Sequence, residues 1–239
     1  MDYSFSVFAH PDAWISLVTL TFLEIVLGVD NIIFISIVTN KLPPEKQRKT
    51  RNLGLLLALV FRIGLLLAIT WIIGLTTPIF TIFDNAFSGR DLILIGGGFF
   101  LIAKATSEIH EKVANKETEK KVSGAATVGS VILQIILLDI IFSFDSILTA
   151  VGLTPHVMVM IIAVVIAMVV MMFFAGSISK IINKYPTLQM LALSFLIMIG
   201  LTLILEGFEV HVNKAFVYVA VLFSLTVELL NIRLRRNFD

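Results

Sequence analysis

Residues 23–33 read LEIVLGVDNII, and residues 138–148 read LDIIFSFDSIL. Aligned without a gap, the two segments share three polar positions in the same order, 115 residues apart: Glu24 with Asp139, Asp30 with Asp145, and Asn31 with Ser146. Both segments lie inside long apolar stretches, where a carboxylate is costly and usually marks a functional site. Four carboxylates in two matched pairs therefore predict one site that is built by two related halves of the chain.

The composition predicts an all-α polytopic membrane protein. The chain has 239 residues, of which 58% are hydrophobic and 15% charged. An average soluble domain is about 45–50% apolar and about 25% charged. Stretches of about 20 apolar residues, long enough to span a bilayer, recur along the sequence. The chain has no cysteine, which excludes disulfides and thiolate metal sites. We expect no cleavable signal peptide, because residues 1–11 lack a basic segment.

Seven membrane-spanning helices are predicted from these stretches and from the proline and charged residues between them. They cover residues 12–38, 50–76, 91–110, 124–151, 157–181, 187–207 and 215–234. Of the 18 lysines and arginines, 15 then fall on one side of the membrane. Arg90 and Lys214 fall on the other side, and Arg62 lies inside the second span. Because basic residues stay in the cytoplasm, the N-terminus is predicted to be outside and the C-terminus inside.

This topology makes the duplicated motif an inverted repeat. The first and fourth spans carry the motif and cross the membrane in opposite directions, as in many transporters. A weaker similarity between the two halves pairs Glu108-Ile109-His110 with Glu209-Val210-His211. We therefore interpret residues 1–239 as a single membrane domain. It consists of a first three-helix repeat (12–110), a cytosolic linker (111–123), an inverted second repeat (124–211), and an extra helix with a basic cytosolic tail (212–239).

The spacing of the motif predicts a distortion as well as a site. Six residues on a regular helix turn the side chain by about 240° net, so Glu24 and Asp30 would not share a face. Gly28 lies between them, and glycine lets a membrane helix bend where it lines a cavity. We therefore expect a kink near Gly28 that brings the six motif residues to one cavity. The predicted metal ligands are Glu24, Asp30, Asn31, Asp139, Asp145 and Ser146.

Oxygen ligands of this kind favour hard divalent cations such as Mg²⁺, Ca²⁺ and Mn²⁺. The same carboxylates would bind protons when the metal leaves, which is what cation–proton antiport requires. A structural alternative is that the acids pair with Arg62 or Lys104, and Arg62 is interpreted as a structural counter-ion because the other half has no matching arginine. Glu108 and His110, like Glu206, Glu209 and His211, fit either an interfacial cap, which we favour, or metal binding.

Two runs of residues are interpreted as packing surfaces. The glycines at 96–98 favour close contact between helices, and the methionine run at 158–172 favours packing or lipid contact. Sequence signatures of an enzyme or an ATP-binding loop are absent. We therefore expect no enzyme activity, and transport that is not driven by ATP in this chain.

Five segments together resemble the TerC family of bacterial integral membrane proteins. They are LEIVLGVDNIIF, LLDIIFSFDSIL, KATSEIHE, LILEGFEVHV and VELLNIR, and the resemblance covers about residues 10–235 in order. It implies the compact form, without the cytosolic domains that some members append. The family was named for tellurium resistance and is placed among exporters with inverted three-helix repeats.

The resemblance implies Mn²⁺ efflux across the bacterial inner membrane and carries the ion site to the same six motif residues. The implied partners are a divalent metal ion and membrane lipid, with no nucleic acid and no cofactor beyond the transported ion. A second copy of the chain and the secretion machinery are further candidate partners. Two other functions stay open: exchange of Ca²⁺ or another cation, and a membrane scaffold or assembly factor for secretion, metalation or tellurium resistance. Direct tellurite transport is disfavoured because the site is acidic.

Overall fold

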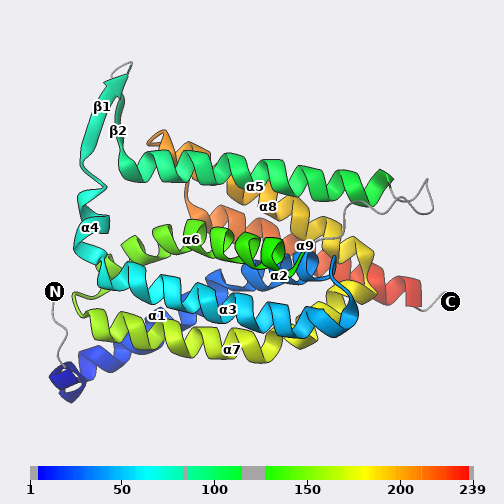
Figure 1. The fold of residues 1–239 in the computed structure, drawn as a ribbon, viewed down its shortest axis with the longest axis horizontal. Coiled ribbons are helices and arrows are strands. Elements are labelled where there is room, and N and C mark those ends of the chain that lie inside the picture. Colours follow the sequence, from blue (N-terminus) through cyan, green and yellow to red (C-terminus); the bar gives the residue numbers. More distant parts are fainter. Residues whose placement is uncertain (1–4, 83–84, 115–126, 211, 237–239) are drawn as a thin grey trace. The chain divides into compact units, whose positions relative to one another are not determined.

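The computed structural model describes residues 5–82, 85–114, 127–210 and 212–236, and is dominated by helices (Figure 1). In chain order the elements are η1 (Phe5–Ala9), α1 (Pro11–Leu27), α2 (Val29–Thr39), α3 (Pro44–Leu67), α4 (Ile69–Gly74), β1 (Pro78–Ile82), β2 (Asn85–Ser88), α5 (Gly89–Ala114), α6 (Val128–Leu153), α7 (Val157–Lys184), α8 (Pro186–Gly207) and α9 (Lys214–Arg236). The all-α membrane fold class is confirmed.

The seven predicted spans each coincide with helix. Six helices are long and apolar enough to cross a membrane, and the pair α1 and α2 makes a seventh span if it is taken as one bent helix. The second predicted span contains both α3 and the short α4, which are separated at Ala68. The linker predicted at 111–123 begins inside α5, which continues to Ala114, and its remaining residues lie outside the described part of the chain.

The first compact unit is formed by Met1–Thr77 and Gly124–Lys180. It contains α1 to α4, α6 and all but the last turn of α7. Helix α3 lies along α6, and both α1 and α2 contact α6 (Figure 1). A side chain at Gly54 of α3 would come within 2.6 Å of Ile135 of α6, so the glycine allows these two helices to approach closely.

The second compact unit is formed by Pro78–Ser123 and Ile181–Asp239. Its centre is the long contact between α5 and α8, against which α9 also packs. A Cβ atom at Gly98 would lie 2.4 Å from the carbonyl oxygen of Gly200, and one at Gly200 would lie 2.8 Å from that of Gly98. The glycine run at 96–98 therefore supports close helix packing, as predicted, although only open space faces a Cβ at Gly96.

An antiparallel hairpin of β1 and β2 precedes α5, where the sequence analysis predicted no strand. Phe80 stacks on Phe87, whose ring also meets Phe208 after α8. Ser88 and Asp91 then begin α5 with a reciprocal cap: the backbone N–H of Ser88 donates to the Asp91 carboxylate at 2.9 Å, and the Asp91 N–H donates to Ser88 Oγ at 3.3 Å. Such pairs satisfy backbone donors that a helix start leaves unpaired.

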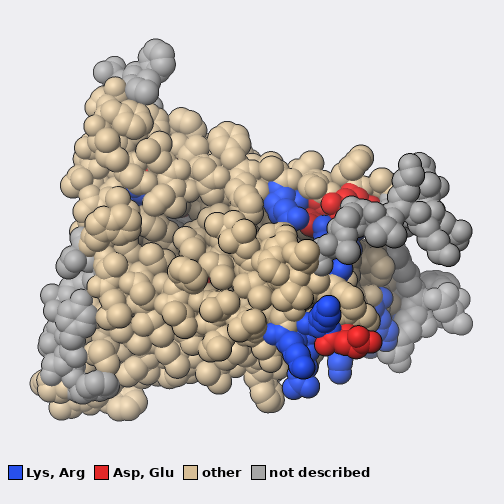
Figure 2. Space-filling view, in the orientation of Figure 1, with Lys and Arg blue, Asp and Glu red and all other residues tan. Residues whose placement is uncertain are grey.

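Charged side chains gather at helix ends, as the membrane-spanning fold requires. Figure 2 shows most of the lysine, arginine and acidic residues of that face where α3 begins and where α5 ends. The methionine run of α7 is partly internal, since Met160, Met168 and Met171 are buried. The packing interpretation of that run is therefore confirmed for these three residues.

Candidate functional site: a buried arginine between two motif acids

The first span is broken at Gly28, as the motif spacing predicted. The segments Pro11–Leu27 and Asn31–Thr39 meet at an angle of 41°. Gly28 has an ordinary right-handed backbone (φ −92°, ψ −5°), so its conformation does not demand glycine. Packing is close at this position: a Cβ atom there would lie 2.2 Å from Sδ of Met171 on α7, so the methionine side chain would have to move. The break therefore lies at a point of close contact with a neighbouring helix.

A single arginine joins the first acids of the two motif copies. Arg62 on α3 donates from Nη1 to Glu24 Oε2 of α1 at 2.5 Å, and from Nη2 to Asp139 Oδ1 of α6 at 3.0 Å. Its Nε donates to Ser143 Oγ at 2.7 Å, and Ser143 Oγ donates to Asp139 Oδ2 at 3.1 Å. The three charged residues are no more than 6% exposed. Three helices thus meet at one closed polar cluster.

The electrostatics of this cluster explain why all its members are needed. A buried charge without a partner is strongly unfavourable, and a buried ion pair is tolerated only when its geometry satisfies the remaining donors and acceptors. The planar guanidinium has fixed donors that can serve two carboxylates and a hydroxyl at once. One positive charge faces two carboxylates, so an ionised cluster keeps a net negative charge. The interpretation of Arg62 as a counter-ion agrees with these contacts.

The other predicted ligands lie one to two turns further along the chain, Asp30 and Asn31 on α2 and Asp145 and Ser146 on α6. Asn31 and Ser146 are buried, and Ser146 Oγ donates to the backbone carbonyl of Ser143 at 3.3 Å. The side chains of Asp30 and Asp145 lie outside the described part of the structure. Among the described side chains, no three histidine, aspartate or glutamate groups lie close enough together to hold a metal ion. The structure therefore brings together Glu24 and Asp139, and leaves the six-residue metal site as a prediction.

The two motif copies differ in backbone. Helix α6 runs without interruption from Val128 to Leu153, whereas the first copy is split into α1 and α2. Ser143 stands where the first copy has Gly28, and its hydroxyl binds the carboxylate one turn earlier. Ser143 was not among the six predicted ligands. Its spacing of four residues after Asp139 was the available signal for a direct contact within the site.

Comparison with known proteins identifies the family of this chain. Residues 9–238 match the family model described as "Integral membrane protein TerC family". The chain belongs to the TerC family. It is 52% identical over 234 residues to the UPF0053 inner membrane protein YgdQ of Escherichia coli K12, covering 98% of each chain. It is 49% identical over 233 residues to a UPF0053 protein of Haemophilus influenzae, covering 97% of this chain and 98% of that one. No solved structure matches.

A longer relative shares the same membrane region. The UPF0053 inner membrane protein YoaE of Escherichia coli K12 is 48% identical over 229 residues, which are 95% of this TerC protein and 44% of YoaE. Relatives named as inner membrane proteins and six to seven candidate spans make this chain a multi-pass inner membrane protein. The residues of the buried cluster all lie within the matched range.

The acids of the second unit of this TerC protein have basic partners of their own. Lys104 Nζ lies 2.8 Å from Glu108 Oε1, one turn away on α5, and Arg90 Nη2 lies 3.3 Å from Glu206 Oε1. These pairs favour the structural interpretation of Glu108 and Glu206 over metal binding. His211 lies outside the described residues.

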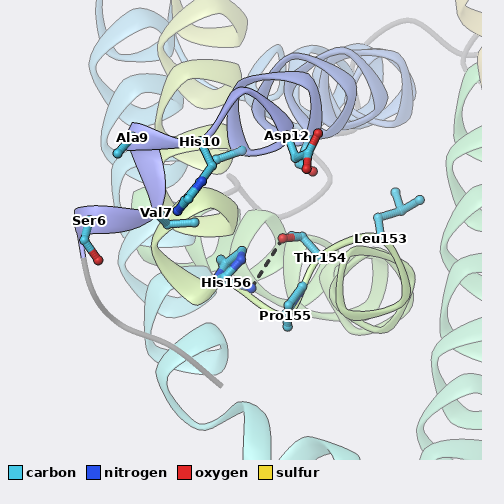
Figure 3. A pocket seen from close by; sticks show the side chains of 11 residues that line it. Ser6, Val7, Ala9, His10, Asp12, Leu153, Thr154, Pro155 and His156 are labelled. Atoms are coloured by element: carbon cyan, nitrogen blue, oxygen red, sulfur yellow. Dashed lines mark hydrogen bonds between the residues drawn. The ribbon is translucent and has the colours of Figure 1, made fainter.

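A cavity of about 630 Å³ opens where α1 begins, which the sequence analysis did not predict (Figure 3). It is lined by η1, the first turns of α1 and the segment that joins α6 to α7. His10, Asp12 and His156 contribute polar groups, and the backbone N–H of His156 donates to Thr154 Oγ1 at 3.3 Å. Because the lining residues come from three separate segments of the chain, no local sequence motif predicted this cavity.

Proposed function

We propose that this TerC-family chain is a secondary transporter that exports a divalent metal cation, with Mn²⁺ as its substrate, by alternating access around intramembrane carboxylates. The observation that carries the proposal is the meeting of Glu24 and Asp139 at the buried Arg62. These residues come from the two matched motifs, so both halves of the chain contribute to one polar centre. Charged groups in such a place are expensive and mark ion pathways.

In this proposal the acids of the two motif copies have separate roles. Arg62 already engages Glu24 and Asp139 and holds α1, α3 and α6 together. The transported ion would be bound mainly by Asp30 and Asp145, with oxygen atoms of Asn31 and Ser146 completing a hard ligand set suited to Mn²⁺. The helix break at Gly28 adds backbone carbonyls near the ion, as broken helices of transporters do. Protonation of the same carboxylates after release would couple export to protons.

The distribution of spans supports an inverted repeat. The first and second spans share the first unit with the fourth and fifth, and the third span shares the second unit with the sixth. Matched spans of the two proposed repeats therefore always fall in the same unit. The reciprocal contact of Gly98 and Gly200 joins the third and sixth spans in the manner that a two-fold arrangement would produce.

The ion would leave the site along one face of α1. Glu24 and Leu20 line a cavity of about 10 Å³, which is close to the room that one water molecule needs. Ala13 and Ser16, further back on the same face, line the larger cavity of Figure 3. Apolar side chains between the two cavities, including Leu20, would close this route in the present conformation and part when the site opens outward.

Neutralising Asp30 or Asp145 tests the site. We expect Asp30→Asn and Asp145→Asn each to abolish manganese efflux in a host that lacks other exporters, because the ion loses a charged ligand. Intracellular manganese measured by mass spectrometry after a manganese challenge gives the readout. Glu45→Gln removes an exposed acid at the start of α3 that lines neither cavity, so it is the matched control and should keep full efflux.

Two results would decide against the proposal. Unchanged efflux in both variants would remove Asp30 and Asp145 from the ion site. A wild-type effect on manganese that persists when all four motif carboxylates are neutralised would favour a scaffold instead of a transporter. Uptake of Mn²⁺ and Ca²⁺ into proteoliposomes separates the manganese assignment from calcium exchange.

A further inference from the structure

Arg51, on α3, is a buried cation without an anionic partner. It is 7% exposed, and its Nε is buried with no hydrogen-bond acceptor. Within the described ranges, no carboxylate forms an ion pair with it. The other deeply buried arginine of the chain, Arg62, lies on the same helix and has two carboxylates and a hydroxyl as acceptors. The contrast shows that the described part of the protein offers the buried Nε of Arg51 no acceptor.

The surroundings of Arg51 increase this imbalance. Arg48 lies one turn earlier on the same face of α3, and Lys46 and Lys49 are close in the chain. Like charges nearby make burial of a cation less favourable, and an unpaired buried charge costs several kcal/mol. An anion from outside the chain would remove both penalties, because it would supply acceptors and the opposite charge together.

The position of Arg51 indicates which anion this is. Arg51 lies about two helical turns from Pro44, where α3 begins. Its Nη2 is 3.5 Å from the place that a Cβ atom of Gly176 on α7 would occupy, so the glycine leaves room beside the guanidinium. Further along α7 on that face, Lys180 is exposed, and α7 ends at Lys184. Helix α3 begins and α7 ends near this position, and the ends of membrane-spanning helices are where lipid headgroups are expected.

We propose that Arg51 is the centre of a phosphate-binding site between α3 and α7, occupied by the headgroup of an anionic phospholipid. Arginine binds phosphate through two parallel N–H donors, and Arg48 and Lys180 add attraction at the rim. Basic pockets between membrane helices at their cytoplasmic ends bind anionic headgroups in this way. The site is separate from the motif carboxylates and stands whether or not the chain transports manganese.

Thermal unfolding of the purified full chain in neutral detergent tests the site. The midpoint is measured while dioctanoyl phosphatidylglycerol, dioctanoyl phosphatidylcholine or inorganic phosphate is added. We expect phosphatidylglycerol to raise the midpoint saturably and phosphatidylcholine to have little effect. In Arg51→Gln the apparent affinity for phosphatidylglycerol should fall about tenfold or more, since a charge-assisted hydrogen bond is lost. Lys49→Gln removes the same charge from an exposed position of the same helix and should keep the affinity.

A second variant keeps the arginine and blocks the space. Gly176→Leu should weaken phosphatidylglycerol binding while leaving every charge in place, so it remains informative if Arg51→Gln does not fold. Saturable stabilisation by inorganic phosphate that is lost in Arg51→Gln would support the phosphate site and name solution phosphate as its ligand. Equal responses of Arg51→Gln and Lys49→Gln to phosphatidylglycerol would overturn the proposal.

Discussion

At the scale of single residues, Arg62 has the largest expected effect on stability. Arg62→Met would leave Glu24 and Asp139 buried without a cation, and breaking a buried pair in this way costs about 3–5 kcal/mol. We expect the free energy of unfolding, measured by titration with SDS, to fall by about that amount. Arg62→Lys should recover only part of the loss, because an ammonium group cannot reproduce the fork that reaches both carboxylates and Ser143.

The control for this prediction removes the whole cluster. In the triple variant Arg62→Met, Glu24→Gln and Asp139→Asn this cluster holds no charge, so the triple variant should be more stable than Arg62→Met alone. If the triple variant is less stable than the single one, the cost of Arg62→Met does not come from uncompensated carboxylates. Lys49→Gln, an exposed change on α3, should alter stability by less than about 0.5 kcal/mol.

At the scale of elements, the crossing of α5 and α8 depends on glycine at one position of the run 96–98. Gly98→Ala would place a methyl group 2.4 Å from the backbone oxygen of Gly200, and backbone cannot move aside cheaply. We expect a loss of about 1–3 kcal/mol in the free energy of unfolding. Gly96→Ala faces open space on the same helix and should be neutral, or stabilising by up to about 1 kcal/mol. Equal losses in both variants would show that the crossing does not depend on Gly98.

At the scale of the whole molecule, the distribution of basic residues predicts the orientation in the membrane. The chain has no cysteine, so single cysteines can report it without background. Thr77→Cys, at an exposed position after α4, should react with a membrane-impermeant maleimide in intact spheroplasts. Lys49→Cys, in the basic first turns of α3, should react only after the membrane is opened. The opposite pattern would invert the orientation and the proposed direction of the ion path.

Much of the architecture could be predicted from the lengths of the apolar stretches and from the proline and charged residues between them. The seven spans follow from stretches of about 20 apolar residues, because a bilayer offers backbone groups no partners and forces them into helices. The break at Gly28 was also predicted from the sequence, since Glu24 and Asp30 flank this glycine at a spacing that puts them on different faces of a straight helix. The hairpin Pro78–Ser88 did not, because its strands are short and stabilised by Phe208, which is distant in the chain.

The amino-acid sequence of this chain determined that it lies in a membrane, where its candidate spans fall, and which acids recur in matched positions. These properties depend on local composition and spacing, which a linear sequence states directly. Only the tertiary structure decided that Arg62 is the partner of Glu24 and Asp139, and that Arg51 has no such partner among the residues that the structure describes. Ion pairing depends on which helices meet and at what level, and these contacts join residues 38 and 77 positions apart. The sequence pattern alone does not predict which of several buried acids will pair with a given arginine or lysine.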